Sequence, residues 1–188
     1  IEGTPWLDWL LLTKRPENIR LMVPLRWGSD SKPKNLWLGC TVENQEMAEQ
    51  RLPHLLSIPS TVRFVSYEPA LGPVVFTELS TDDTCEECGE VVLHNALSFG
   101  DVRCGCGMES TTMHRLDWII VGGESGNSAR PFNPAWAHET VMACRKAEVA
   151  VFVKQMGSNP TLREGSGWGK IKAKKGDNLA EWSAQLRV

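Results

Sequence analysis

The sequence predicts an α/β protein built from parallel βα units, with a small cysteine-rich insertion between the third and fourth strands. Five short apolar runs recur along the chain, each about the length of a β-strand. Four of them are nearly continuous in apolar residues, which is typical of strands buried on both faces of a parallel sheet. Stretches with helical periodicity separate several of these runs, and this alternation predicts right-handed βα units.

The composition fits one globular domain that carries an insertion. The chain has 188 residues, of which 41% are hydrophobic and 23% charged, so wholesale disorder is excluded. No apolar run approaches the roughly 20 residues that a membrane-spanning helix needs, and we expect no membrane association. The 20 Lys and Arg residues against 23 Asp and Glu give a net charge of −3, which provides no global attraction for nucleic acid but leaves a local patch open. The chain shows no signal peptide and begins at Ile1, so we expect a cytoplasmic protein and a piece of a longer chain.

The predicted elements alternate between strand and helix. The five strands lie at residues 9–12, 36–40, 62–65, 118–121 and 149–153. One helix begins at Pro16, a favourable first helical residue, and a second begins after the capping residue Asn44 and contains Pro53, which predicts a kink or an early break. A third helix begins at Asn133-Pro134 and runs to about residue 146. Because each crossover returns the chain to the same end, we expect parallel strands in chain order, with the tail or a second copy covering the exposed first strand.

This pattern divides the chain into four parts. Residues 1–76 form three βα units, 77–116 the insertion, 117–156 two further units, and 157–188 a polar tail with a short helix near 179–186. The tail contains a lysine cluster at residues 170–175. We interpret this cluster as a solvated face in preference to a contact with nucleic-acid phosphates.

Charged side chains follow all five predicted strands within three residues. Because the carboxyl ends of parallel strands lie on one face, these side chains should meet at one mouth of the sheet. They form either a ring of ion pairs or, as we favour, a site for a polar ligand or metal. The candidate residues are Lys14, Glu43, Glu68, Gly122, Gly123, Glu124, Arg130 and Lys154. We also expect the three carboxylates to lie close together and to raise one another's pKa.

The glycine-rich segment 122–126 has two interpretations. Glycines after a buried strand let the backbone approach a phosphate closely, and Arg130 would lie within reach of an anion there. The segment lacks the GxGxxG spacing, however, and no Walker lysine follows it. A tight turn that needs positive φ explains the glycines equally well.

The insertion carries the pattern of a structural zinc site. Cys85 and Cys88 are two residues apart and are followed by Gly89, while Cys104 and Cys106 form a second pair after fifteen residues. Four thiolates suffice for a closed tetrahedral zinc site that stabilises a segment without its own core. The alternatives are free thiols or a disulfide, which a cytosolic location disfavours. Cys40 and Cys144 lie in a strand and on an apolar helix face, where we expect small buried hydrophobic residues.

Long, ordered motifs cover nearly all of the chain outside the insertion. They are LLLTKRPE at 10–17, NLWLG at 35–39 with VENQ at 42–45, RFVSYEP at 63–69 with LGP at 71–73, DWIIVGGESG at 117–126, ARP at 129–131, FVKQ at 152–155, and EW at 181–182 with LRV at 186–188. Together they resemble an uncharacterised, phage-associated protein family that is related to radical-SAM enzymes.

The resemblance implies a barrel of βα units, of which this chain would form the C-terminal five strands as an incomplete TIM-like barrel. Members of that family carry an N-terminal cysteine cluster similar to the one that binds an iron–sulfur cluster in radical-SAM enzymes. This sequence has no such CxxxCxxC-like motif. An iron–sulfur cluster and S-adenosylmethionine are therefore expected only if a segment preceding Ile1 supplies the ligands. The candidate residues match motif positions and would form the substrate or cofactor side of the barrel.

Three hypotheses of function follow from these observations. The favoured one is a fragment of a radical-SAM-like enzyme whose barrel mouth binds a polar or phosphorylated molecule, with nucleic acid as a less supported ligand. The second is a phage-derived, non-enzymatic binding protein whose zinc insertion contacts a partner. The third is a hydrolase or lyase that uses Glu43, Glu68 and Glu124 around a divalent cation.

Overall fold

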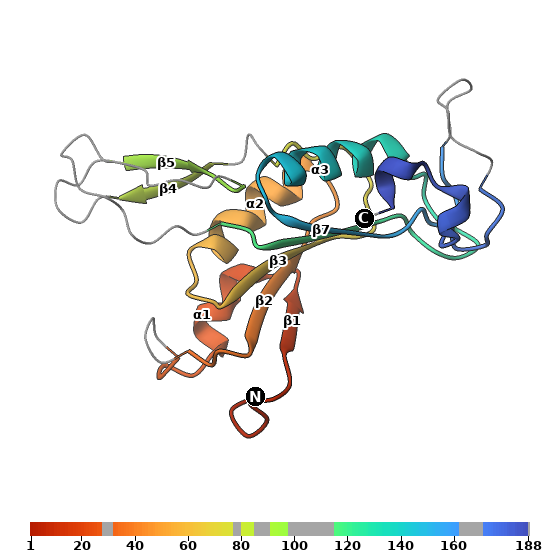
Figure 1. The fold of residues 1–188 in the computed structure, drawn as a ribbon. Helices are drawn as coiled ribbons and strands as arrows, with labels where there is room; N and C mark the ends of the chain where they lie inside the picture. Colours follow the sequence, from red (N-terminus) through yellow and green to blue (C-terminus); the bar gives the residue numbers. More distant parts are fainter. Residues whose placement is uncertain (28–31, 77–79, 85–90, 98–114, 162–170, 188) are drawn as a thin grey trace.

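The computed structural model describes residues 1–27, 32–76, 80–84, 91–97, 115–161 and 171–187. Its centre is a five-stranded parallel sheet that does not close into a barrel, with strand order β1-β2-β3-β6-β7 (Figure 1). These strands are β1 (Trp9–Thr13), β2 (Leu36–Thr41), β3 (Val62–Tyr67), β6 (Trp118–Gly122) and β7 (Ala150–Gln155). The predicted parallel order is confirmed, because every neighbouring pair in this sheet is parallel.

The three predicted helices are present and begin at their predicted signals. Pro16–Asn18 forms a 3-10 turn, η1, which leads into the single helical turn α1 (Ile19–Met22). The side chain of Asn44 accepts a hydrogen bond from the Met47 amide and caps α2 (Gln45–Leu56). Asn133 caps α3 (Pro134–Lys146) in the same way. Helix α2 continues for three residues beyond Pro53, so the early break predicted there does not occur.

Helices α1, α2 and α3 lie on the same side of the sheet (Figure 1). The strand residues that point toward them form the core together with the inner faces of α2 and α3. Leu38, Cys40, Val65, Ile119 and Val121 all have exposed fractions of 2% or less. Burial of these side chains supplies the hydrophobic stabilisation of the fold.

The opposite side of the sheet, which we call the open face, carries apolar side chains, and no helix of the described residues forms a layer over it. Its paired positions include Leu12 beside Gly39, Gly39 beside Phe64, and Phe64 beside Trp118. A Cβ at position 39 would come within 2.5 Å of the Phe64 ring, so the glycine makes room for that ring. The Trp118 ring packs against Trp37 in a T-shaped arrangement and against Phe64 in a tilted one, with ring centroids 6.2 and 6.0 Å apart, respectively.

Strand β1 departs from the expectation of strands buried on both faces. Leu10, Leu11 and Leu12 are 44%, 39% and 50% exposed. The strand has a neighbour on one side only, and no element in the described part of the chain covers its outer edge. The tail does not provide this cover, contrary to one prediction. It packs instead beyond the carboxyl end of β7, the other edge strand, where the Met156 amide donates to the Gly176 carbonyl.

The tail also lacks the single short helix predicted near residues 179–186. Two 3-10 turns, η2 (Leu179–Glu181) and η3 (Ala184–Leu186), take its place. Between them Trp182 has extended backbone angles, φ −89° and ψ 155°. Its side chain is 3% exposed, and its indole donates to the Gly176 carbonyl at 2.9 Å. Burial of this tryptophan therefore interrupts the helix.

The insertion contains a hairpin that the sequence analysis did not predict. Strands β4 (Ser80–Thr84) and β5 (Val91–Asn95) pair in antiparallel fashion, with Thr84 opposite Val91. The root of the insertion is closed by a hydrogen bond of 3.0 Å from the Leu116 amide to the Ala96 carbonyl. Ala96 is fully buried, so the insertion is anchored to the main core at this point.

Candidate binding site at the carboxyl ends of the strands

Backbone hydrogen bonds tie together the loops that follow β2, β3, β6 and β7. The Leu71 amide donates to the Glu43 carbonyl at 2.8 Å, and the Ala70 amide donates to the Gly122 carbonyl at 2.9 Å. The Gly123 amide in turn donates to the Gln155 carbonyl at 3.0 Å. The predicted convergence of these loops at one mouth is therefore present, and it rests on the backbone as well as on side chains.

Glu43 lies at the β2 end of the mouth between two cations. Its carboxylate forms ion pairs with Lys14, which follows β1, and with Arg51 of α2 at 2.7 Å. Arg51 also donates to the Thr41 carbonyl at 2.7 Å, which fixes the guanidinium against the end of β2. Burial raises the pKa of Glu43, but hydrogen bonds and charge from Lys14 and Arg51 outweigh it, so the pKa lies below its ordinary value.

Glu68 follows β3 at the centre of the mouth, and its side chain contacts β7. Its carboxylate accepts hydrogen bonds from Lys154 at 3.2 Å and from the side-chain amide of Gln155 at 3.3 Å. The same Gln155 amide donates to the Gly123 carbonyl at 3.0 Å. A Cβ at position 122 would stand 3.2 Å from a Glu68 carboxylate oxygen, so Gly122 provides room for this carboxylate.

Glu124 forms a fourth ion pair of the mouth, with Arg130. The guanidinium donates through two nitrogens at 2.8 Å each, and the Arg130 amide donates a third hydrogen bond at 2.8 Å. The side-chain bonds from Arg130, followed by its backbone bond, lower the pKa of Glu124 to about 2. Hydrogen bonding to Glu124 raises the pKa of Arg130, and the charge of Glu43 adds a smaller influence in the same direction.

The expectation that the three carboxylates raise one another's pKa was wrong for Glu43 and Glu124, whose pKa values are lowered. Each carboxylate has its own basic partner, and attraction to a bonded cation exceeds repulsion from a more distant carboxylate. The three carboxylates consequently do not form a shared cation site. In the described ranges, no group of three or more His, Cys, Asp or Glu side chains is arranged to hold a metal ion.

The glycine-rich segment serves close packing between backbones. A Cβ at Gly123 would lie 2.4 Å from the Met156 carbonyl oxygen, and one at Gly157 would lie 2.5 Å from the Glu124 carbonyl oxygen. The amides of Gly123 and Gly126 donate to Gln155 and Ser158, so protein atoms already satisfy them. Gly126 has φ of +117°, as the turn interpretation expects, while Gly123 allows a close approach of backbones that neither interpretation included.

Two site residues were missed by sequence reasoning. Arg51 neutralises Glu43 from the second turn of α2, and Gln155 bridges Glu68 and Gly123. The adjacency of Gln155 to Lys154 in the FVKQ motif was the available signal, whereas nothing local indicated that Arg51 turns back toward Glu43. Tyr67, which is fully buried, also supports the mouth, because its hydroxyl donates to the Gly72 carbonyl.

The cysteines divide into two groups. Cys40 and Cys144 are buried, as predicted, and burial raises the pKa of each thiol to about 12. A thiol with such a pKa stays protonated at neutral pH and is a poor nucleophile or metal ligand. The predicted zinc ligands Cys85, Cys88, Cys104 and Cys106 lie outside the described residues.

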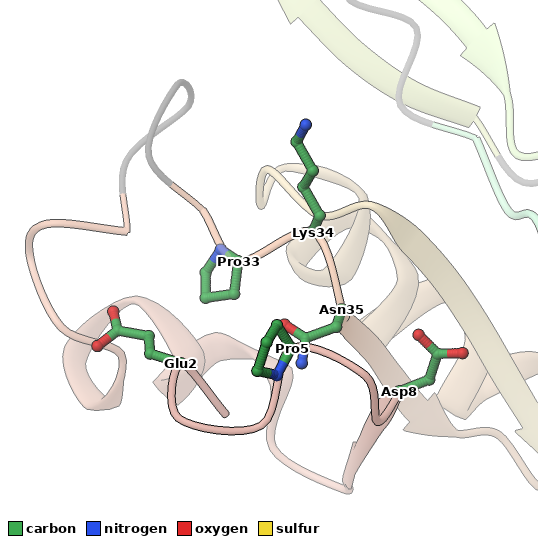
Figure 2. A pocket seen from close by; sticks show the side chains of 6 residues that line it. All are labelled: Glu2, Pro5, Asp8, Pro33, Lys34 and Asn35. Carbon is green, nitrogen blue, oxygen red and sulfur yellow. The ribbon is translucent and has the colours of Figure 1, made fainter.

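A hollow of about 490 Å³ lies at the opposite end of the sheet from the mouth (Figure 2). It is lined by Glu2, Pro5, Asp8, Pro33, Lys34 and Asn35, which precede β1 and β2. The Asn35 side chain donates to three carbonyl groups of the N-terminal segment, and Glu2 pairs with Arg26. These polar groups have partners within the chain, and the hollow is separate from the predicted site.

The fold and the mouth together define a parallel α/β protein with ion-paired loops at the carboxyl ends of its strands. Residues 1–183 match the family described as "Protein of unknown function (DUF5131)", and the chain belongs to this family. No curated protein and no solved structure matches the chain. None of the helices in the described ranges has the length and apolar character needed to cross a bilayer.

Proposed function

We propose that this chain forms the ligand-binding wall of a barrel-type protein related to radical-SAM enzymes, and that its mouth binds a polar or phosphorylated molecule. One observation carries the proposal. Five parallel strands follow in chain order, and their carboxyl-end loops are joined around charged side chains. Ligands of open and closed parallel α/β folds bind at this end of the strands.

The order of the strands supports a barrel in preference to a doubly wound sheet. A doubly wound sheet reverses its order at a switch point and carries helices on both faces. This sheet keeps one direction from β1 to β7, and its helices lie on one face. Leu21 and Met22 of α1 are 86% and 81% exposed, as are the leucines of β1 to a lesser degree. A further parallel βα unit would cover both, with its strand beside β1 and its helix beside α1.

The cysteines in the described part of this chain do not fit an iron–sulfur cluster. Such a cluster needs several thiolates, and the sequence has no CxxxCxxC-like motif. Cys40 and Cys144 are buried thiols with raised pKa values. Chemistry with S-adenosylmethionine and a radical-SAM cluster would thus depend on cysteines from outside these 188 residues.

The cations of the mouth support an anionic ligand. The side chains of Lys14 and Lys154 are 61% and 54% exposed although both contact carboxylates. An incoming phosphate or carboxylate could contact the exposed parts of these ammonium groups while Glu43 and Glu68 keep the lysines in place. The more buried contacts of Glu43 with Arg51 would meanwhile hold the loop after β2 in place.

A structural zinc ion in the insertion is the second part of the proposal. The β4–β5 pairing supports it, because Cys85 directly follows β4 and residues 85–90 connect two paired antiparallel strands. A thiolate pair at the end of a hairpin is a common half of a four-cysteine zinc site. The same module would serve the alternative hypothesis, a non-enzymatic phage-derived protein that contacts a partner through its insertion.

Two measurements test these proposals. The full-length protein, purified anaerobically, should contain about four iron and four sulfide per chain if it is a radical-SAM-like enzyme. Absence of iron and sulfide after reconstitution would remove that class and leave a binding protein. Separately, the 188-residue chain should hold one zinc ion, and Cys88→Ser should release it while the circular dichroism of the main sheet persists. Cys144→Ser is the matched control and should retain the zinc.

A further inference from the structure

A lysine-rich turn of the tail lies beside the carboxyl ends of β6 and β7. The Ser158 hydroxyl donates to the Lys174 carbonyl at 2.7 Å, and the Gly176 amide donates to the Ala173 carbonyl at 2.9 Å. The Ser158 amide donates to the Glu124 carbonyl at 2.8 Å. One residue therefore joins the turn to the Glu124–Arg130 ion pair, and the tail becomes part of the mouth.

The conformation of this turn is fixed by contacts of its own. The Glu181 carboxylate accepts hydrogen bonds from the amides of Lys172 and Ala173 at 2.6 and 3.1 Å. The bond from Ala173, then that from Lys172, lowers the pKa of Glu181, so the carboxylate stays charged and bonded to the backbone. The buried Trp182 anchors the segment through its bond to Gly176. A preformed turn loses little entropy when a ligand binds.

The lysine side chains of the turn differ from the other cations of the mouth. Lys174 and Lys175 are exposed and, in the ranges described by the structure, take part in none of the ion pairs. Lys14, Arg130 and Lys154 each contact a carboxylate. The turn consequently presents positive charge that no carboxylate of the described residues offsets in an ion pair, although the whole chain has a net charge of −3.

The shape of the arrangement favours an extended polyanion over a single phosphate group. A compact phosphate site uses several converging backbone amides, and the amides of Gly123 and Gly126 are already bonded within the protein. The cations instead belong to separate segments along the rim, at Lys174, Arg130 and Lys154. Successive phosphates of a nucleic-acid strand would match separated cations of this kind.

We infer that the turn at residues 172–175 is a nucleic-acid contact, in which Lys174 and Lys175 bind backbone phosphates of a single strand that extends to the mouth. This inference rests on the proposed function, because it names the phosphorylated ligand of the same mouth. The contact is independent of base sequence, since phosphates carry no sequence information directly.

Fluorescence anisotropy with a labelled 20-nucleotide oligothymidylate tests the inference on the 188-residue chain. The double variant Lys174→Gln/Lys175→Gln should bind about tenfold or more weakly at 50 mM salt. The slope of log K against log[salt] should become less steep by about 1.4, or about 0.7 for each lost phosphate contact. The matched control is Arg145→Gln/Lys146→Gln, which removes two exposed positive charges from the end of α3 that precedes β7. Its affinity should remain within about twofold of the unaltered chain.

Equal losses in both double variants would overturn the inference, as would absence of binding by the unaltered chain. Turn-dependent binding to vesicles with 30% anionic lipid, without oligonucleotide binding, would also overturn it in favour of a membrane surface. Calorimetry with inorganic phosphate separates the two proposals. The decisive outcome has two parts: phosphate binds and the Lys154→Gln substitution weakens phosphate binding, whereas the oligonucleotide does not bind. In that case the mouth proposal stands and the nucleic-acid inference fails.

Discussion

The two edges of the sheet differ in how the chain completes them. Beside β7, the tail bonds to Met156 and Ser158 and buries Trp182 and Leu186 to 3% and 0% exposure. Beside β1, no described element forms a further layer, and three consecutive leucines remain 39–50% exposed. The tail thus packs beyond the carboxyl end of β7, whereas β1 has no such neighbour among the described residues and presents apolar side chains.

This difference indicates which edge strand can pair with a further strand. Exposed apolar edge strands pair readily with other chains, and natural proteins avoid them by charge, covering loops or closure. The tail packs beside the carboxyl end of β7, whereas β1 has none of these devices among the described residues. We therefore expect substitutions that break the contacts of the tail beside β7 to destabilise the fold. Substitutions in β1 should alter association with other chains and have little effect on stability.

The largest expected effect is that of Trp182→Ala. The substitution removes a buried indole and its hydrogen bond to Gly176, and large-to-small changes at such positions cost about 3–5 kcal/mol. The matched control is Trp6→Ala near β1, where the side chain is 77% exposed and the free energy of unfolding should change by less than about 0.5 kcal/mol. Urea denaturation followed by far-ultraviolet circular dichroism measures both. Similar losses in the two variants would contradict the asymmetry.

The second prediction compares an ion pair at the mouth with an ion pair near the start of β1. Glu43→Gln leaves Arg51 and Lys14 without their carboxylate in a site where that side chain is 12% exposed. We expect a loss of about 1.5–3 kcal/mol, since hydrogen bonds to charged groups contribute this much. Glu2→Gln, which breaks the more exposed pair with Arg26 near β1, should have a clearly smaller effect. Urea denaturation at pH 7 gives both values, and the opposite ranking would show that the mouth pairs are not structural.

The third prediction concerns close backbone approach. Gly123→Ala would place a Cβ 2.4 Å from the Met156 carbonyl oxygen, which must move, and overpacking of this kind costs about 1–3 kcal/mol. Gly3→Ala is the control at the β1 end, because a Cβ there has no atom within 4 Å. Thermal melts of the two variants test the pair. An unchanged melting temperature for Gly123→Ala would mean that the loops are not packed as described.

Much of this architecture was predictable from the sequence because it depends on local signals. Apolar runs gave the five strands, and Asn44 and Asn133 cap α2 and α3 as their positions suggest. The gathering of the charged strand ends followed from the parallel order alone. Strand β4, by contrast, is the run Ser80–Thr84, which contains only polar residues and gives no hydrophobic alternation to read.

The remaining errors concern contacts between distant segments. The pKa of Glu124 depends on Arg130 and that of Glu43 on Arg51, and a sequence does not show which cation reaches which carboxylate. The tail offers a similar case. Its helical periodicity was interrupted at Trp182 by a contact with Gly176, which has φ of +63° and packs against Gly157. Tertiary contacts of this kind override local propensity.

The fourth prediction addresses the β1 edge directly. Leu12 is 50% exposed, so Leu12→Lys should change the free energy of unfolding by less than about 0.5 kcal/mol. A charge on an exposed edge strand should nevertheless reduce self-association. Sedimentation velocity over a concentration series compares the variant with Leu179→Lys, an equally exposed leucine in the tail, which is 53% exposed. If both substitutions reduce association to the same degree, the β1 edge is not the site of contact.

The smallest expected effect is the pH response of the Glu124–Arg130 pair. The pKa of Glu124 is lowered from 4.5 to about 2, so the folded protein binds this proton less readily than the unfolded chain. The pair should therefore stabilise the fold fully above pH 4.5, and its contribution should be lost as the pH falls toward 2. The effect is small because the carboxylate is 29% exposed and the guanidinium 56% exposed. Carbon-13 NMR titration of the Glu124 carboxyl should give a midpoint near 2, and Arg130→Gln should return it toward 4.5. A midpoint near 4.5 in the unaltered protein would mean that Arg130 is free in solution, and so available to an anion at the mouth.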